Sequence, residues 1–579
     1  MSSGIEHHPL TCRIATPDAE KGAISPPCEH QQPQQQQQHV RGIETSDETA
    51  LHRALKARHI TMIAIGGALG TGLLLGTGKA LAGAGPGAVA ISYTLVGFLV
   101  YVVMTALGEM AAWLPMSAGF TGYASRFCDP SLGFALGWTY FFKYIIVTPN
   151  QITAGAMVLE YWIPRSQLNP GVFVAVFLTA IVLINWLGVR FFGEFEFWLS
   201  SFKVLVLVAL MLVTVVIAAG GGPDGDPRGF RYWRDPGAFA VDDAWDVSPA
   251  MARFLGVWST MIVATFAYLG TELVGVTVGE AQNPRKTIPR AIRLTFFRIL
   301  FFYCLSVFLL GLCVPYDSKD LTFSGAGGAA AGASASPFVV AVKLAGFKTL
   351  PAIVNGCVVV FIFSGATSDL YIASRTLYGL ASDGDAPAIF KKTDDRGVPY
   401  VALGASSLFG LLAFMTVANS TKEVFGRFVN MVTIFGLLSW ISIVVTHICF
   451  LRARRLQGIP DAAMPYVAPF GLWGSYVALA SCCTISLTKN FTAFLVTPVA
   501  WVDVVTGYVG IPIYLLLIFA HKLVTKSKRV LPQDADFYTG KDAIDREEEA
   551  FLEEQARKRE MEPDSFVARV YGRYLSWLF

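Results

Sequence analysis

Long apolar segments are the feature of this 579-residue sequence that most limits how it can fold. A helix that crosses a bilayer needs about 20 mostly apolar residues. Backbone polar groups in lipid must pair within the protein, which restricts such segments to helices or closed barrels. We predict an all-α integral membrane protein with twelve transmembrane helices, at 60–82, 87–109, 132–158, 171–189, 198–220, 255–279, 294–314, 349–379, 400–418, 428–450, 471–489 and 502–521.

The two ends of the chain differ from its middle in composition. Residues 1–59 and 522–579 are polar and charged, whereas only 15% of the whole chain is charged, against about 25% in an ordinary globular domain. The Gln-rich stretch 31–38 predicts a disordered N-terminal tail over 1–59. We expect a twelve-helix membrane domain over 60–521 and a C-terminal tail over 522–579, whose acidic and basic runs favour a solvated helix.

Charge in the loops predicts the orientation of the chain. Lys and Arg are concentrated in cytoplasmic loops of membrane proteins, and here they follow the even-numbered segments, as Arg285, Lys286, Arg290, Arg293, Lys391, Lys392, Arg396, Arg452, Arg454 and Arg455. Both termini are therefore predicted to be cytoplasmic. The net charge of +3 does not suggest a nucleic-acid partner. The nine cysteines have no metal-site spacing, so no metal or other cofactor is expected.

The first apolar segment contains an unusual run of glycines, from Gly66 to Gly72 (GGALGTG). One interpretation is close helix packing through small residues. The other is a broken helix, which membranes tolerate where the unwound backbone lines a cavity. The half-helix that resumes at Gly70, Thr71 and Gly72 would then offer free N–H groups to an anion such as a carboxylate.

The sixth apolar segment has a similar signal, from Phe266 to Gly275 (FAYLGTELVG), with the carboxylate of Glu272 inside it. The first and sixth segments each begin a half of five helices. Matching breaks in both halves indicate an inverted repeat with a substrate site near the membrane midplane. The sequence therefore predicts a carrier of small solutes.

Several motifs resemble the yeast-type amino-acid permeases of the amino acid–polyamine–organocation superfamily. They are His59–Gly78 (HITMIAIGGALGTGLLLGTG), Gly108–Ala111 (GEMA) and Gly279–Ile292 (GEAQNPRKTIPRAI). The resemblance covers roughly residues 45–545. It implies a five-plus-five inverted repeat with broken helices 1 and 6 and two extra helices. It also implies proton-driven amino-acid uptake at a fungal plasma membrane.

Other motifs resemble the fungal dicarboxylic amino-acid permeases, which carry glutamate and aspartate. These motifs are Val147–Trp162 (VTPNQITAGAMVLEYW), Gly193–Val204 (GEFEFWLSSFKV), Gly229–Phe239 (GFRYWRDPGAF) and Ser368–Ala381 (SDLYIASRTLYGLA). We expect acidic amino acids as substrates. A broad-range or neutral amino-acid permease and an amino-acid sensor built on a transporter body are the alternatives. No nucleophile, metal or paired-carboxylate motif indicates an enzyme.

The resemblance also implies roles for residues at the two breaks. The substrate carboxylate would meet Gly70, Thr71 and Gly72. Its ammonium would meet the unwound backbone near Ala68 and the segment Phe266–Leu269, which includes Ala267. Phe266 occupies the position of an aromatic gate in related carriers, although ordinary core packing would also explain it.

Two charged residues inside apolar segments are candidates for proton coupling. Glu272 could bind and release a proton, or it could only tie helices together through hydrogen bonds. Lys203 could replace the sodium ion that sodium-coupled relatives hold between spans one, five and eight, or its side chain could extend to the interface. Glu109 and Arg298 lie near segment ends, where interfacial or structural roles are expected. Asp369 receives no assignment.

The third apolar segment contains Lys143, Asn150 and Gln151. Lys143 and Asn150 share a helical face. Many yeast-type permeases carry Glu where Gln151 stands, which argues against cationic substrates here. The ammonium of Lys143 and the amides of Asn150 and Gln151 are suited to bind an anionic substrate side chain. Lys143 could equally pair with a protein carboxylate, for which Glu272 and Asp369 are the candidates.

The tails contain lysines suited to ubiquitination, although positive-inside anchoring is the alternative and is the preferred interpretation for the group at 522–528. The resemblance implies ubiquitin-ligase adaptors as partners there, besides the amino acid, protons and the lipid bilayer. The lysines concerned are Lys21, Lys56, Lys522, Lys526, Lys528 and Lys541.

Overall fold

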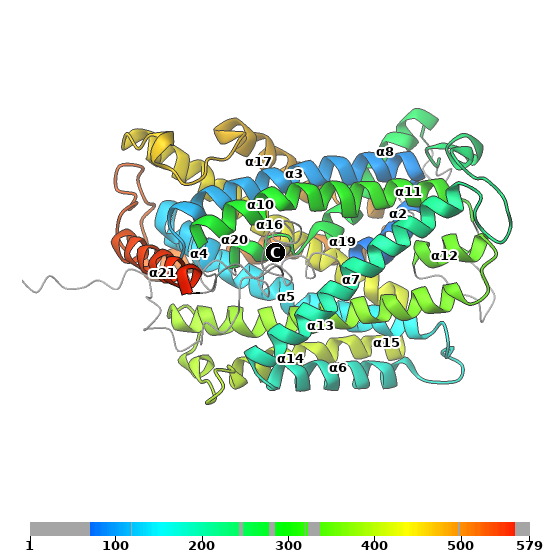
Figure 1. Ribbon diagram of the computed structural model, residues 1–579, viewed down its shortest axis with the longest axis horizontal. Helices are drawn as coiled ribbons and strands as arrows, with labels where there is room; N and C mark the ends of the chain where they lie inside the picture. Colours follow the sequence, from blue (N-terminus) through cyan, green and yellow to red (C-terminus); the bar gives the residue numbers. More distant parts are fainter. Residues whose placement is uncertain are drawn as a thin grey trace, which may run out of the picture. The chain divides into compact units, whose positions relative to one another are not determined.

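The computed structural model describes residues 70–116, 118–241, 247–276, 284–318, 320–321, 336–495 and 498–561. Every regular element in these ranges is a helix (Figure 1). The tail predicted over 1–59, the first part of span one with Ala68, and the end of the C-terminal tail lie outside the described residues.

The helices follow the predicted apolar segments. Their bounds are η1 (Gly72–Gly76), α2 (Thr77–Ala84), α3 (Pro86–Trp113), α4 (Gly119–Phe127), α5 (Pro130–Leu159), α6 (Pro170–Trp186), α7 (Val189–Ala218), η2 (Trp233–Gly237), α8 (Pro249–Tyr268), α9 (Leu273–Val276), α10 (Pro284–Arg298), η4 (Ile299–Leu305), α11 (Ser306–Cys313), α12 (Pro337–Leu344), α13 (Leu350–Ser382), η5 (Ala388–Lys391), α14 (Tyr400–Gly410), η6 (Leu411–Phe414), α15 (Met415–Ala418), α16 (Thr421–Leu456), η7 (Asp461–Ala463), α17 (Gly471–Thr488), α18 (Thr492–Leu495), α19 (Trp501–Tyr508), α20 (Gly510–Thr525) and α21 (Lys541–Met561).

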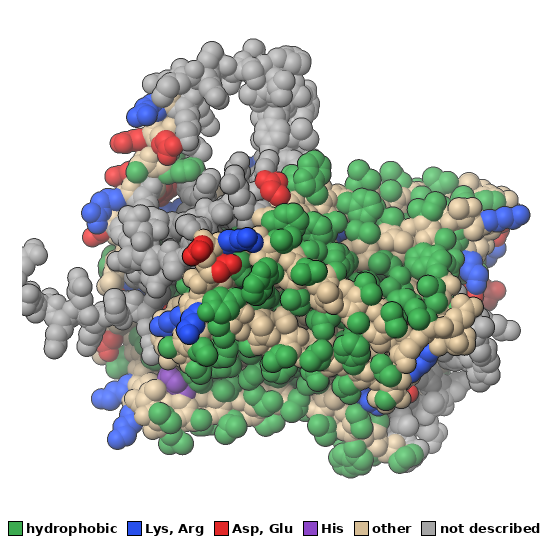
Figure 2. Space-filling view, turned by 90° about the horizontal axis from the view of Figure 1, so that it is seen from below, with side chains coloured by type: hydrophobic (Ala, Val, Ile, Leu, Met, Phe, Trp, Pro, Cys, Tyr) green, Lys and Arg blue, Asp and Glu red, His purple; other side chains and the backbone are tan. Residues whose placement is uncertain are grey.

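Nine helical stretches among the described residues are long and apolar enough to cross a membrane. The 30-residue α5 and the shorter apolar α6 account for two more of the predicted segments, and η1 with α2 for the described part of span one. On the face in Figure 2, hydrophobic side chains cover the middle and charged side chains gather toward the two ends. The prediction of an all-α, multi-pass membrane protein is confirmed.

The fifth span starts earlier than its apolar run predicts. The prediction placed its start at residue 198, but α7 begins at Val189. Gly188, with a φ of 101°, separates α6 from α7 in a backbone conformation that favours glycine. The first turns of α7 therefore carry Glu194 and Glu196. These charged residues lie outside the apolar run from which the span was predicted. Span ten is also longer than predicted, since α16 runs from Thr421 to Leu456.

Three long helices form the framework around which the others pack. α5 packs along both α13 and α16, and α3 packs along α8. The N-terminus of α5 is capped by Asp129, whose carboxylate accepts from the backbone N–H of Ser131 at 2.8 Å. Pro130 at its first position suits a helix start, because that N–H would have no intrahelical partner.

The described part of the C-terminal tail contains the predicted helix, α21 (Lys541–Met561), and a segment before and within it is attached to the helical body. We call residues 530–548 the C-terminal strap. Phe537 is fully buried and packs on Trp113 and Phe127, with ring centroids 6.5 and 5.1 Å away. Arg126 donates to the backbone carbonyl of Asp536 at 2.6 Å.

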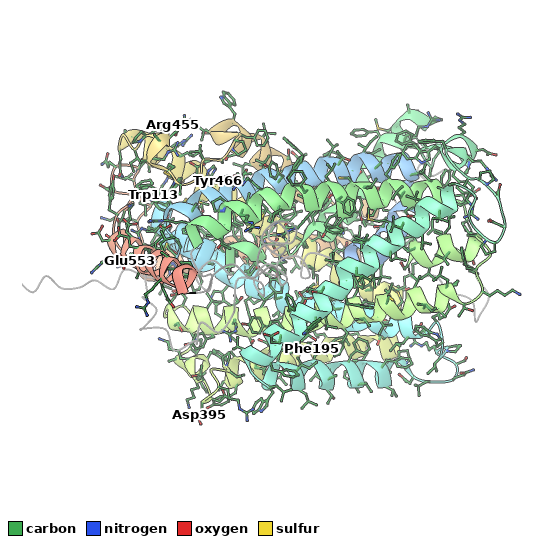
Figure 3. The ribbon with its side chains drawn as sticks, viewed as in Figure 1. Trp113, Phe195, Asp395, Arg455, Tyr466 and Glu553 are labelled. Atoms are coloured by element: carbon green, nitrogen blue, oxygen red, sulfur yellow. The ribbon has the colours of Figure 1, made fainter. Side chains whose placement is uncertain are left out.

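The strap also reaches the start of α10. Arg285 forms ion pairs with Asp545 at 2.5 Å and Glu548 at 3.0 Å. Burial acts to raise the pKa of Asp545, but hydrogen bonds from Lys541 and Arg285 outweigh it, so that pKa lies below its ordinary value. In Figure 3, Trp113 and Glu553 lie at the same end of the helices as Arg455. That end carries the loops predicted to be cytoplasmic.

Candidate functional site

The sixth span is broken where the glycine pattern predicts. α8 ends at Tyr268, Leu269 is extended, and α9 begins at Leu273. Gly270 has a φ of 102°, which a side chain would strain. The break leaves Glu272 in a non-helical turn with no exposed surface.

The described part of span one meets this break directly. The helix starts at Thr71, and Gly72 lies against the backbone of Ala267. A Cβ added to Gly72 would collide with the Cα and N atoms of Ala267, so only glycine fits. The helix start and the break therefore form one continuous wall.

A cavity lies between this wall, α5 and α13. It contains about 390 Å³ of empty space, a figure that includes space open to solvent. Eight predicted site residues and four others line it: Gly70, Thr71, Gly72, Lys143, Gln151, Phe266, Ala267 and Leu269, with Tyr144, Val147, Gly270 and Asp369. Asn150 is buried and is not part of this lining.

Lys143 and Glu272 form a buried ion pair at the cavity. Lys143 also lies over the ring of Tyr144, 4.7 Å from its centroid. Glu272 accepts two further hydrogen bonds, from Trp440 Nε1 at 3.3 Å and from the backbone N–H of Gly270 at 3.1 Å. The pair therefore joins the break in span six to α5 and α16. Of the two carboxylates considered from the sequence, Glu272 is the one that pairs with Lys143.

Gln151 and Asp369 both line this cavity and are hydrogen-bonded to each other. Gln151 Nε2 donates to Asp369 Oδ2 at 3.2 Å, which joins α5 to α13. The cavity face of α5 thus runs through Lys143, Val147 and Gln151, whereas the sequence placed Asn150 there. Lys143, Val147 and Gln151 lie on one i, i+4 ridge of the helix, whereas Asn150 lies on a neighbouring row, although it is only about 20° away from Lys143 around the helix axis.

Lys203 lies outside the cavity lining, in a second buried cluster. It forms an ion pair with Glu196 at 3.4 Å, and neither side chain is exposed. Glu196 also accepts from Ser200 at 2.8 Å and from Ser364 at 2.7 Å. The cluster ties α7 to α13, the fifth span to the eighth.

Glu109 occupies the centre of a third buried cluster. Its carboxylate accepts from His447 Nε2 at 3.1 Å, Arg454 Nη1 at 2.6 Å and the backbone N–H of Ala468 at 2.9 Å. This geometry agrees with the structural role considered from the sequence. Arg298 is partly buried, and its Nη2 atom has no hydrogen-bond partner within the described ranges.

Sequence reasoning missed two partners of the buried charged residues. Glu196 pairs with Lys203, and Trp440 donates to Glu272. Glu196 lies seven residues before Lys203 on one helical face, and an earlier start for α7 would have revealed it. Trp440 lies 168 residues from Glu272 in an apolar segment, and no local pattern indicates their contact.

Solved structures with a similar fold are transporters. Two mutants of an Eremococcus coleocola manganese transporter match with TM-scores of 0.52 and 0.53, at 12% and 11% identity. Each match covers 81% of this chain and 94% of the other. At this identity the likeness concerns the fold alone.

Sequence relatives specify the family. The profile of the amino acid permease family matches residues 59–531. A dicarboxylic amino acid permease of Saccharomyces cerevisiae is 49% identical over 92% of this chain and 86% of its own length. An uncharacterized amino-acid permease of Schizosaccharomyces pombe is 46% identical over 84% and 92%. A lysine-specific permease of Saccharomyces cerevisiae is 39% identical over 82% and 76%. This chain is a transporter that belongs to the amino acid permease family.

Proposed function

We propose that this permease imports acidic amino acids, L-glutamate and L-aspartate, together with protons. The observation that carries the proposal is the position of Lys143, a buried cation in the cavity lining that can bind an anionic side chain. The 49% identity to a dicarboxylic amino acid permease supports the same substrate class.

The proposed proton coupling arises because the substrate carboxylate and Glu272 compete for the ammonium of Lys143. The carboxylate of an arriving acidic side chain attracts Lys143 away from Glu272. A buried carboxylate that has lost its cation is costly, and taking up a proton removes the charge. Glu272 thus gains a proton when an anionic substrate binds, and it releases the proton when the substrate leaves and Lys143 returns.

The rest of the substrate would be held at the helix breaks. Its α-carboxylate meets Thr71 and the N–H groups of Gly70 and Gly72, where a helix start favours negative charge. Its ammonium meets backbone carbonyls near Phe266 and Leu269. Phe266, which lines the cavity and packs edge-on against Phe425 with centroids 6.2 Å apart, serves as the gate over the substrate.

Lys203 would support the return of the empty carrier. Its ion pair with Glu196, and the hydrogen bond from Ser364 to Glu196, link the fifth and eighth spans. A lysine that replaces a bound sodium ion allows transport that depends on protons and is independent of sodium.

Uptake in a permease-deficient yeast tests the proposal. Radiolabelled Glu, Asp, Gln, Leu, Lys and Pro are compared at two pH values, with and without sodium. We expect concentrative uptake of Glu and Asp that increases at the lower pH and does not respond to sodium. Preferential uptake of Leu or Lys would contradict the acidic specificity. Uptake that requires sodium and ignores pH would contradict the coupling.

Two further proposals concern the location and turnover of the permease. Both termini face the cytoplasm at the plasma membrane, and ubiquitin-ligase adaptors recognise tail lysines after substrate exposure. Replacing Lys21 and Lys56 with Arg should then slow removal of the permease from the surface after a substrate pulse. Unchanged removal would count against an N-terminal regulatory segment.

A further inference from the structure

We infer that Gln151 and Asp369 form the ammonium-binding end of the cavity. Gln151 Oε1 is the acceptor, and Asp369 is the residue that holds the amide in position. The inference rests on the proposed function only in taking an amino acid as the substrate, because every amino acid carries the ammonium that this subsite would bind.

The orientation of the Gln151 amide follows from its partner. An ionised carboxylate only accepts hydrogen bonds. Asp369 therefore fixes Nε2 of Gln151 on its own side, at 3.2 Å. The other end of the amide, Oε1, is buried and has no hydrogen-bond partner in the part of the chain that the structure describes. The Gln151 side chain is 94% buried and lines the cavity. Such an acceptor is costly unless a donor reaches it.

The polar side chains of the cavity separate into donors and acceptors. Lys143 is a donor toward anionic groups, and the helix start at Thr71 favours them. Gln151 Oε1 only accepts, and the Asp369 carboxylate accepts from Gln151 Nε2. An acidic amino acid at neutral pH has one donor group, its ammonium, and two carboxylates. The ammonium therefore fits the acceptor end, and its three N–H bonds allow it to meet backbone carbonyls at the break as well.

A glycine on α13 makes room for this arrangement. Gly365 lies one turn before Asp369, and a Cβ at this position would lie 3.1 Å from Gln151 Nε2. Gly356 on the same helix would place its Cβ in open space. The pair Gly365 and Gly356 therefore offers a matched steric test of the amide position.

The first experiment exchanges the amide of Gln151 and the carboxylate of Asp369. Gln151→Glu alone places two carboxylates together, and Asp369→Asn alone removes the fixed acceptor that orients the amide. Each should raise the KM for glutamate roughly ten- to a hundredfold, because a hydrogen bond to a charged group contributes about 1.5–3 kcal/mol. The double variant Gln151→Glu/Asp369→Asn restores one carboxylate and one amide. It should recover most of the lost affinity, and a double variant as poor as the worse single would overturn the pairing.

The second experiment isolates the ammonium. Glutarate has both carboxylates of glutamate but no ammonium. In Gln151→Leu, the KM for glutamate should rise while the inhibition constant of glutarate stays as in the parent permease. An equal increase in the KM for glutamate and in the inhibition constant of glutarate would mean that Gln151 has only a structural role. If glutarate does not inhibit the parent, a normal glutamate KM in Gln151→Leu would still overturn the inference.

Glycine variants complete the design. Gly365→Ala should raise the KM for glutamate, and Gly356→Ala should not. If the parent imports a different amino acid, the same variants are measured with that amino acid and its deaminated analogue. Failure of the acidic specificity is thereby distinguished from failure of the ammonium subsite.

Discussion

Lys143 and Glu272 lie 129 residues apart in the sequence and form an ion pair with almost no exposed surface. One partner belongs to the long helix α5 and the other to the non-helical turn of span six. A conformational change that moves this turn relative to α5 must break or move the pair. The pair is thus suited to couple substrate binding to the movement of the broken helix.

Removing one member of the pair should destabilise the protein more than removing both. Lys143→Gln leaves Glu272 buried without a cation, which costs about 3–5 kcal/mol. The double variant Lys143→Gln/Glu272→Gln removes both charges and should recover most of the stability. Thermal unfolding of detergent-solubilised protein measures the stability of the single and the double variant. Equal instability of the single and double variants would contradict the pairing. Glutamate transport should stay low in the double variant, because no cation remains to bind the substrate.

Neutralising Glu272 alone should separate exchange from accumulation. Glu272→Gln cannot bind and release a proton, but its amide can still accept from Lys143 and Trp440. Concentrative glutamate uptake should be lost, while exchange of internal for external glutamate continues. Uptake and counterflow in the same vesicles give both rates. A variant that still accumulates glutamate in response to a pH gradient would exclude Glu272 as the proton carrier.

The contact between Gly72 and Ala267 should tolerate no side chain. Gly72→Ala forces the helix start away from the break, and overpacking of this kind costs about 1–3 kcal/mol. We expect loss of uptake. Gly83→Ala on α2 is the matched control, because its Cβ would have no neighbour within 4 Å. Surface level and uptake are measured for both variants, and normal uptake by Gly72→Ala would contradict the close contact.

Filling the proposed carboxylate position should block binding without unfolding the protein. Among the described residues, a Cβ at Gly70 would come within 4 Å of Gln151 Nε2 alone, at 3.8 Å, so these helices leave room for it. Gly70→Val should reach the surface at the normal level and fail to bind glutamate. Normal uptake by this variant would place the substrate carboxylate elsewhere.

Phe537 should anchor the C-terminal strap. Truncating a buried Phe costs about 3–5 kcal/mol, so Phe537→Ala should release residues 530–548 from Trp113 and Phe127. Hydrogen exchange and protease cleavage of this segment should increase. Tyr538→Ala is the control, since 59% of that residue is exposed. Equal protection in both variants would show that other contacts hold the strap.

The sequence alone determined the class of fold and predicted which residues border the candidate site. Long apolar segments can only be helices in lipid, so the all-α membrane fold follows from composition. The glycine runs at 66–72 and around Gly270 predict interrupted helices, and the described residues of both runs border the cavity. Gly70, Thr71 and Gly72 were named from the glycine pattern and Phe266, Ala267 and Leu269 with the help of the family resemblance, and all six line the cavity.

Only the tertiary structure decided which buried groups meet. Periodicity along α5 shows that Lys143 has polar neighbours on one side, but the rotation of the helix against α13 and α16 selects Gln151 over Asn150. The partners of Lys143, Lys203 and Gln151 are Glu272, Glu196 and Asp369. Two of these three contacts join different spans, and the third depends on where α7 begins. A buried charge requires a partner, which the sequence can predict; helix packing determines which partner it is.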